Sequence, residues 1–275
     1  MISLIRATQA SQVIPGMLAA FEKPTTKDFI WPCWGPSVRV LGVTACYNFI
    51  FFLVTLAVIS TVGFFYVAFR KPAIVPGKLQ LVAELGFQFV RENIVLQMIG
   101  QEGMVFFTFL SSLFFFILFG NIWEVIPGVN ATMNARIAFP LVLATISWLT
   151  YNTVGIRRHG FLGYMRKVMF PPGVPIVLKP LIALINFVSE IIFRPITLTV
   201  RLFANMVAGH FLLAVFFLGT LALFSTANFL IIFGLISSVM AVAFVAFEIF
   251  VSILQAFIFA VLSASYISEA MEAAH

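Results

Sequence analysis

Charged residues are scarce in this sequence. Only 9% of its 275 residues are Asp, Glu, Lys or Arg, whereas 62% are hydrophobic; in soluble domains roughly a quarter of the residues are charged. A chain of this length cannot enclose so much apolar surface in one water-facing core, so a lipid bilayer is the expected solvent for much of it. The net charge of +6 comes from short basic clusters between apolar runs, which is typical of membrane-protein loops and does not indicate nucleic-acid binding.

Motifs for redox chemistry, metal binding and nucleotide binding are also missing. The two cysteines, Cys33 and Cys46, form no redox or metal-binding pattern, and we expect no disulfide between them. The three histidines are far apart, and no glycine-rich stretch leads into Lys-Ser or Lys-Thr. The sequence therefore predicts no metal, no cofactor and no bound nucleotide. The first thirty residues also lack the pattern of a removable signal peptide.

Long apolar runs are what the sequence does contain. A single crossing of the ~30 Å hydrocarbon layer needs about 20 residues. Two late runs are twice that length, so each is either a hairpin of two spans or one strongly tilted helix, with Pro195 as a possible kink or break. The expected spans are 48–69, 104–123 and 136–155, followed by the long runs 176–224 and 228–267, with loops at 124–134 and 156–175.

One further segment has the pattern of an interfacial helix. Between 79 and 100, polar residues such as Glu84 and Arg91 interrupt the apolar positions at intervals suited to an amphipathic helix. The sequence thus predicts a single all-α integral membrane domain over 1–275, with about five membrane-crossing helices and one interfacial amphipathic helix. We see no internal repeat.

Basic residues predict the orientation. They cluster after the first and third spans, and loops rich in Lys and Arg are typically cytoplasmic. The N-terminal segment 1–47 is then extracytoplasmic, and the C-terminus is inside if each long run crosses once. The basic residues concerned are Arg70, Lys71, Lys78, Arg157, Arg158, Arg166 and Lys167.

Polar residues inside the two long runs are the candidates for function, because a charge in mid-membrane costs several kcal/mol unless it meets a partner or water. At 100° per residue, one stripe forms on one face of the first run and a second on one face of the last run. The stripes are Glu190, Arg194, Thr197, Arg201 and Asn205, and Glu248, Ser252 and Gln255; His210 lies half a turn away from Arg201.

An antiparallel pairing of the two runs would bring Arg201 to the depth of Gln255 and His210 to the depth of Glu248, although His210 would then point in a different direction from Arg201. Structural roles stay open for most of these residues. Arg194 has the spacing of an ion pair with Glu190, and Asn205 and Gln255 have the character of interhelical hydrogen-bonding residues. Arg201 lies too deep in its run to reach the interface easily.

Three stretches carry a family resemblance. Residues 194–210, RPITLTVRLFANMVAGH, resemble the signature of subunit a of F-type ATP synthases. Glu248 followed by 255–259, QAFIF, resembles the last helix of that family, and the 170–175 loop FPPGVP is similar too. The resemblance covers about 40 to the end of the chain.

The resemblance implies a non-catalytic ion-channel subunit with two half-channels that load and unload carboxylates on a ring of c subunits. It implies that Arg201 is the essential arginine, with Asn205 and Gln255 near it and with His210 and Glu248 in the entry channel. Phe187 stands where many members have a carboxylate, so Glu190 becomes the candidate on the cytoplasmic side. Two long, tilted channel helices are implied as well.

The resemblance further implies the c-subunit ring, b subunits of a peripheral stalk and the rest of the complex as partners. A bacterial plasma membrane is the expected location, with a mitochondrial inner membrane as the alternative. A secondary transporter and an intramembrane enzyme are the two alternative classes of function, and each predicts its own sequence pattern. A stand-alone ion-coupled secondary transporter predicts inverted repeats and broken helices in both halves, and an intramembrane enzyme needs a nucleophile beside a base; the sequence shows neither pattern.

Overall fold

The computed structural model describes residues 38–40, 43–45, 48–126, 133–170, 178–224 and 231–272. Most of the N-terminal segment, both cysteines and the 171–177 part of the proline-rich loop lie outside these ranges. The predicted all-α class is confirmed: apart from the short antiparallel strands β1 (Val38–Val40) and β2 (Val43–Ala45), the regular elements in the described ranges are helices.

Five helical segments in the described ranges are long and apolar enough to cross a membrane. They begin with α2 (Phe49–Phe69), where the side chain of Asn48 caps the helix by accepting the Phe51 N–H at 3.0 Å. The other four are η3 with α4 (Gln101–Phe106 and Phe107–Val125), α5 (Ala138–Met169), α6 to α7 (Lys179–Phe224) and α8 (Ile231–Met271). The predicted amphipathic segment forms α3 (Lys78–Val90) and the π-helical turn η2 (Arg91–Leu96), which do not meet these criteria for a span.

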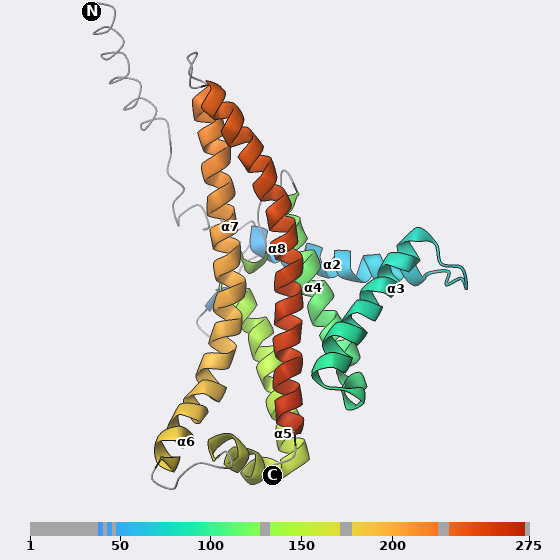
Figure 1. The fold of residues 1–275 in the computed structure, drawn as a ribbon, viewed down its shortest axis with the longest axis vertical. Helices are drawn as coiled ribbons and strands as arrows, with labels where there is room; N and C mark the ends of the chain where they lie inside the picture. Colours follow the sequence, from blue (N-terminus) through green and yellow to red (C-terminus); the bar gives the residue numbers. More distant parts are fainter. Residues whose placement is uncertain are drawn as a thin grey trace, which may run out of the picture.

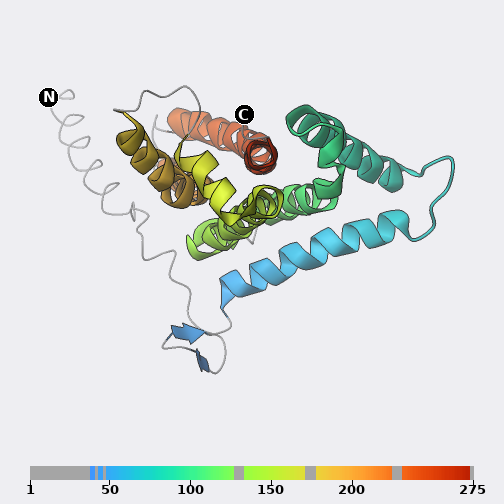
Figure 2. The ribbon, with the colours of Figure 1, turned by 90° about the horizontal axis from the view of Figure 1, so that it is seen from below.

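The long helices α7 (Arg194–Phe224) and α8 pack side by side, and α4 and α5 lie against them (Figure 1). Helix α2 runs across the direction of α7 and α8 in both ribbon views (Figures 1 and 2). At about 1.5 Å per residue, α8 is about 60 Å long, twice the hydrocarbon thickness. If α2 crosses the membrane close to its normal, α7 and α8 must be strongly tilted. This agrees with the alternative in which each long run is one tilted helix rather than a hairpin of two spans.

Pro195 neither breaks nor ends the first long run. Helix α6 (Lys179–Val188) passes through a π-helical turn, η5 (Ser189–Phe193), directly into α7. Arg194 follows η5 directly and donates its N–H to the carbonyl of Ser189, five residues earlier. If this π pattern continued, the Glu190 carbonyl would accept from the N–H of residue 195, but proline has no N–H. The carbonyl of Glu190 is thereby left for partners outside its own helix.

Both predicted loops are corrected where the structure describes them. The first, expected at 124–134, begins two residues later, because α4 continues through Glu124 to Val125. The second was placed at 156–175, but α5 continues to Met169 after a turn at Gly160, whose φ of 72° favours glycine. The segment after the turn is helical because Tyr164 packs back against Gly155.

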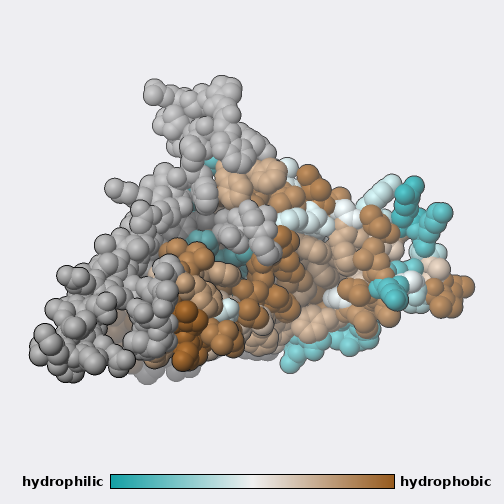
Figure 3. All heavy atoms as spheres, turned by 90° about the horizontal axis from the view of Figure 1, so that it is seen from above, coloured by the Kyte–Doolittle hydropathy of each residue, from teal (hydrophilic) through white to brown (hydrophobic). Residues whose placement is uncertain are grey.

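The exterior is largely apolar, as a lipid-facing surface should be. Seen from above, most of the surface formed by the described residues is brown, the colour of hydrophobic residues (Figure 3). Polar side chains gather towards the link between α2 and α3. On α2, residues such as Ile59, Val62 and Tyr66 are more than half exposed. In water such a surface would drive aggregation, whereas in a bilayer it costs little.

Candidate functional site

Two polar clusters lie at different depths along the α7–α8 pair. The Glu190 cluster consists of Tyr164, Glu190, Arg194 and Glu269, and the Glu248 cluster consists of Glu124 and Glu248. Glu248 and Glu269 are about 30 Å apart along the axis of α8, at about 1.5 Å of rise per residue.

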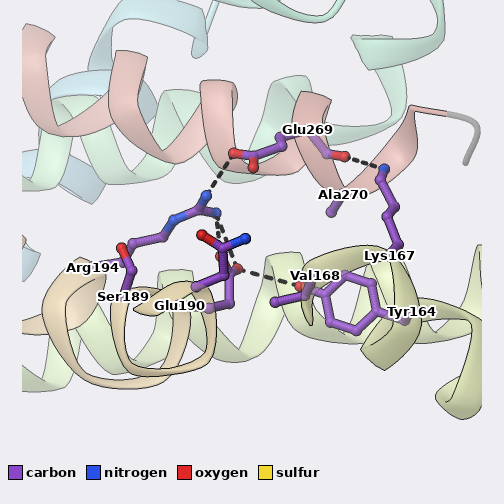
Figure 4. Close-up of a pocket in the computed structure, with 9 residues that line it drawn as sticks. Tyr164, Lys167, Val168, Ser189, Glu190, Arg194, Glu269 and Ala270 are labelled. Atoms are coloured by element: carbon purple, nitrogen blue, oxygen red, sulfur yellow. Dashed lines mark hydrogen bonds and ion pairs between the residues drawn. The ribbon is translucent and has the colours of Figure 1, made fainter. Parts of the chain in front are cut away.

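Arg194 is the centre of the Glu190 cluster. Its Nη1 lies 2.8 Å from Oε2 and 3.0 Å from Oε1 of Glu190, and its Nη2 lies 2.7 Å from Oε2 of Glu269 (Figure 4). The guanidinium also lies over the ring of Tyr266, 4.6 Å from its centroid. The suggested i,i+4 ion pair with Glu190 therefore exists, and α8 supplies a second carboxylate that the sequence did not indicate.

Helix α5 fixes the position of Glu190 in two ways. Trp148 Nε1 and Tyr151 Oη donate to the Glu190 carbonyl, at 3.2 and 3.3 Å. These are the partners of the carbonyl that the π-helical turn before Pro195 releases. The hydroxyl of Tyr164, from the segment folded back at Gly160, donates to Glu190 Oε1 at 3.3 Å. Helix α5 therefore contacts both the main-chain carbonyl and the carboxylate of Glu190.

The Glu248 cluster joins α4 to the middle of α8. The carboxyl groups of Glu124 and Glu248 interact directly with one another, and two carboxyl groups can share a hydrogen bond only when one of them carries a proton. Both residues are buried, with 5% and 8% of their surface exposed. Within the described ranges no Lys or Arg forms an ion pair with either, and one oxygen of each, Glu124 Oε1 and Glu248 Oε2, has no hydrogen-bond partner.

Gly209 allows the close approach of Glu248 to α7. A Cβ at this position would collide with Glu248 Oε1, so an alanine here would force the end of the Glu248 side chain to move. A cavity of about 130 Å³ opens here, lined by Asn205, Gly209 and Glu248 among others. Half-buried His210 is the next residue along α7, so it lies close to Glu248 in depth, and a shared role of the two residues stays a prediction.

Arg201 lies between the two clusters and is exposed on the surface of the protein. Among the described residues it has no ion-pair partner. The exposed positions Thr197, Ala204 and Ala208 follow the same face of α7. This face, with one arginine and otherwise small or apolar side chains, is open to a partner.

The buried face of α7 between the clusters is apolar at Leu198, Leu202 and Met206. On the facing helix α8 the buried residues Ala256, Phe259 and Ala260 are apolar as well. Of the other predicted site residues, Ser252 is buried on α8 and Gln255 is half-buried. Three further buried polar side chains lie between the clusters: Thr199 donates to the Pro195 carbonyl at 2.7 Å, and Ser147 on α5 donates to Ser263 on α8 at 2.8 Å. The stretch between the clusters is therefore mainly apolar, with isolated polar side chains that are hydrogen-bonded locally.

Glu124, Tyr164 and Glu269 belong to the clusters although the sequence interpretation did not include them. Glu124 ends an apolar run three residues after Asn121, a helical spacing that could have placed both on one face of α4. Asn121 is buried and accepts a hydrogen bond from Asn134 at 2.6 Å, which supports that placement. Nothing in the sequence pattern indicated Tyr164 or Glu269, because their roles depend on the turn at Gly160 and on the packing of α8.

Known proteins provide an independent comparison. Residues 49–268 match the family described as ATP synthase A chain. A protein named ATP synthase subunit a from Streptomyces lividans is 40% identical over 258 residues, which cover 93% of this chain and 89% of that protein. The protein of the same name from Rhodococcus erythropolis is 39% identical, covering 92% and 91%, and the one from a Parafrankia species is 45% identical, covering 76% and 70%. Because the match spans the helices that carry both clusters and Arg201, this chain belongs to the ATP synthase A chain family.

Proposed function

We propose that this chain is the proton-translocating stator subunit of a rotary ATP synthase, in which two half-channels load and unload carboxylates on a ring of c subunits. The observation that carries the proposal is the arrangement of the site: two carboxylate clusters centred on the buried Glu190 and Glu248, a mainly apolar stretch between them, and Arg201 on an exposed face at an intermediate position. Such an arrangement gives access from each side of a membrane without a direct path across it.

Each part of the arrangement has a role in this mechanism. A proton from outside passes the Glu248 cluster, with His210 and Asn205 beside it, and neutralises a carboxylate on the ring. The neutral acid can then face lipid, whereas an ionised one would cost several kcal/mol. After the ring has turned, the acid gives up its proton near Glu190 on the cytoplasmic side.

Arg201 keeps the two half-channels apart. A guanidinium remains charged even when water is removed, so it can pair with the ionised ring carboxylate and repel a proton that would leak straight through. Each proton that crosses supplies about 2.3 kcal/mol per 100 mV of membrane potential. The turning ring carries this work to the soluble part of the complex, and no bond is made or broken in this chain.

The partners follow from the same proposal. The exposed face of α7 and α8 would contact the c-subunit ring, while b subunits of the peripheral stalk would hold the chain against rotation within the rest of the complex. The expected location is a bacterial plasma membrane. Ser252 and Gln255 on α8 are proposed to be polar residues that line the approach to the ring.

Co-purification tests the proposal against a stand-alone secondary transporter. We expect the chain, extracted in mild detergent, to come out with a c-subunit ring, and the reconstituted complex to make ATP when a proton gradient is imposed. A chain that purifies alone or as a homo-oligomer, and that carries ions by itself in vesicles, would contradict the proposal.

A further inference from the structure

Arg194 holds two carboxylates that differ greatly in their access to water. The Glu190 side chain is 8% exposed, whereas that of Glu269 is 55% exposed. Glu190 lies beside the buried junction of α5 and α7, and Glu269 lies near the end of α8. The guanidinium therefore connects a buried acid to one that water reaches freely (Figure 4).

A polar cavity joins the same two carboxylates. It measures about 160 Å³ and is lined by Glu190, Arg194 and Glu269, with Tyr164, Lys167 and Asn186 among its other residues. At about 30 Å³ for each molecule in the liquid, this volume holds about five waters. A chain of waters of that size is sufficient to carry a proton from one carboxylate to the other.

The charges of the cluster suit a single proton. One guanidinium faces two carboxylates, so the cluster carries one excess negative charge when both acids are ionised, and it becomes neutral when one proton is bound. The nearby cation, Lys167, donates to the carbonyl oxygens of Glu269 and Glu272, each at 2.6 Å, and so holds the C-terminal end of α8. Because Lys167 also lines the cavity and interacts electrostatically with Glu269, its charge offsets part of this excess.

We propose that Glu269 is the outer acid of a two-carboxylate proton relay, in which Arg194 connects it to Glu190. The inference rests on the proposed function, because Glu190 must first receive the proton released by the ring. The protonated Glu190 gives its proton to cavity water, the Glu269 carboxylate takes up a proton from the same water, and Glu269 releases it to the solvent. The hydrogen bonds of Arg194 shift towards whichever carboxylate is ionised.

The relay makes a specific prediction for Glu269→Gln. The variant leaves Arg194 paired with Glu190 alone, and this neutral pair has little tendency to take up a proton. We expect proton-driven ATP synthesis by the complex to fall about tenfold, which is less than the hundredfold or more typical of a proton-transfer group at a reacting centre, because cavity water leaves Glu190 a slower route. Glu269→Asp should retain part of the rate.

Chemical rescue separates a relay from a structural role. A small buffer such as imidazole, added on the side where Glu269 meets solvent, should restore much of the rate of Glu269→Gln, since it can accept the proton in place of the missing acid. Glu272→Gln is the matched control: it removes an exposed carboxylate one turn further along α8 that forms no ion pair with Arg194. We expect it to keep the normal rate with or without buffer.

Two results would overturn the relay. One is a normal rate in Glu269→Gln; the other is a defect that buffer does not relieve and that comes with reduced assembly or thermal stability. The unaltered complex serves as the reference for the proposed function itself. If that complex makes no ATP from a proton gradient, the proposed function fails, whereas a working complex with an unaffected Glu269→Gln variant contradicts only the relay.

Discussion

The two clusters contain the same acidic groups in opposite electrostatic settings. At Glu190 a guanidinium lies between two carboxylates, and a cavity leads towards an exposed side chain. At Glu248 two buried carboxyl groups face one another with no Lys or Arg paired to them in the described part of the chain. Two such acids can stay buried together only when they share a proton. We propose that the cluster at the middle of α8 holds a proton, whereas the cluster near its C-terminal end passes one on.

The largest expected effect comes from the residue between the clusters. Arg201→Ala should lower proton-driven ATP synthesis on the order of a hundredfold or more, as loss of a preorganised charge does elsewhere. Arg201→Lys should fail too, because a desolvated ammonium can lose its proton whereas a guanidinium does not. The rate of synthesis in reconstituted vesicles measures both.

Arg91→Ala provides the control for Arg201, since it removes an exposed arginine from η2, away from both clusters. It should behave normally. Near-normal synthesis in either Arg201 variant would remove this residue from the mechanism.

The next expected effect concerns the Glu248 cluster. Glu124→Gln and Glu248→Gln should each slow proton-driven synthesis, on the order of tenfold, and the double variant should be little worse than the poorer single one, because both belong to one interacting pair. The rates of ATP synthesis of the unaltered protein, the two single variants and the double variant form a double-mutant cycle. Glu92→Gln, at an exposed position on η2, is the control. Independent, multiplying defects would place the two acids in separate paths.

A smaller effect is expected from substitution of Gly209, which lies against the Glu248 carboxylate. Gly209→Ala should displace the Glu248 carboxylate and cost about 1–3 kcal/mol of stability through overpacking. Gly219→Ala on the same helix is the matched control, because its Cβ would lie an ordinary 3.6 Å from Ser237 Oγ. Thermal denaturation and synthesis rates should separate the two variants; equal behaviour would show that the contact at Gly209 is not needed.

Much of the fold could be predicted from the sequence because it depends on local chemistry. Apolar runs of sufficient length indicated all five segments that could span a membrane, and the depth of Arg201 within its run marked it as a candidate functional residue. The choice between one tilted helix and a hairpin could not be made from the pattern. Only the structure shows that η5 takes up the constraint of Pro195 and lets the helix continue.

The partners of the acids could not be predicted in the same way. Pairing of the two long runs predicts that His210 lies at the depth of Glu248, and this stays a prediction. Helix α4 also packs against α8 and brings Glu124 to that position, and the turn at Gly160 brings Tyr164 to Glu190. Contacts of this kind depend on how separate helices meet, which periodicity within one helix does not report.

In the proposed mechanism, protons pass between the two clusters only on a carboxylate of the ring, which must move past Arg201. Proton conductance of the membrane sector with its ring cross-linked to this chain tests that claim most directly, since a locked ring cannot carry protons by turning. We predict no conductance in the unaltered sector and a steady leak in Arg201→Ala that Glu248→Gln suppresses. A locked, unaltered sector that conducts protons, or an Arg201→Ala sector that remains tight, would contradict the account.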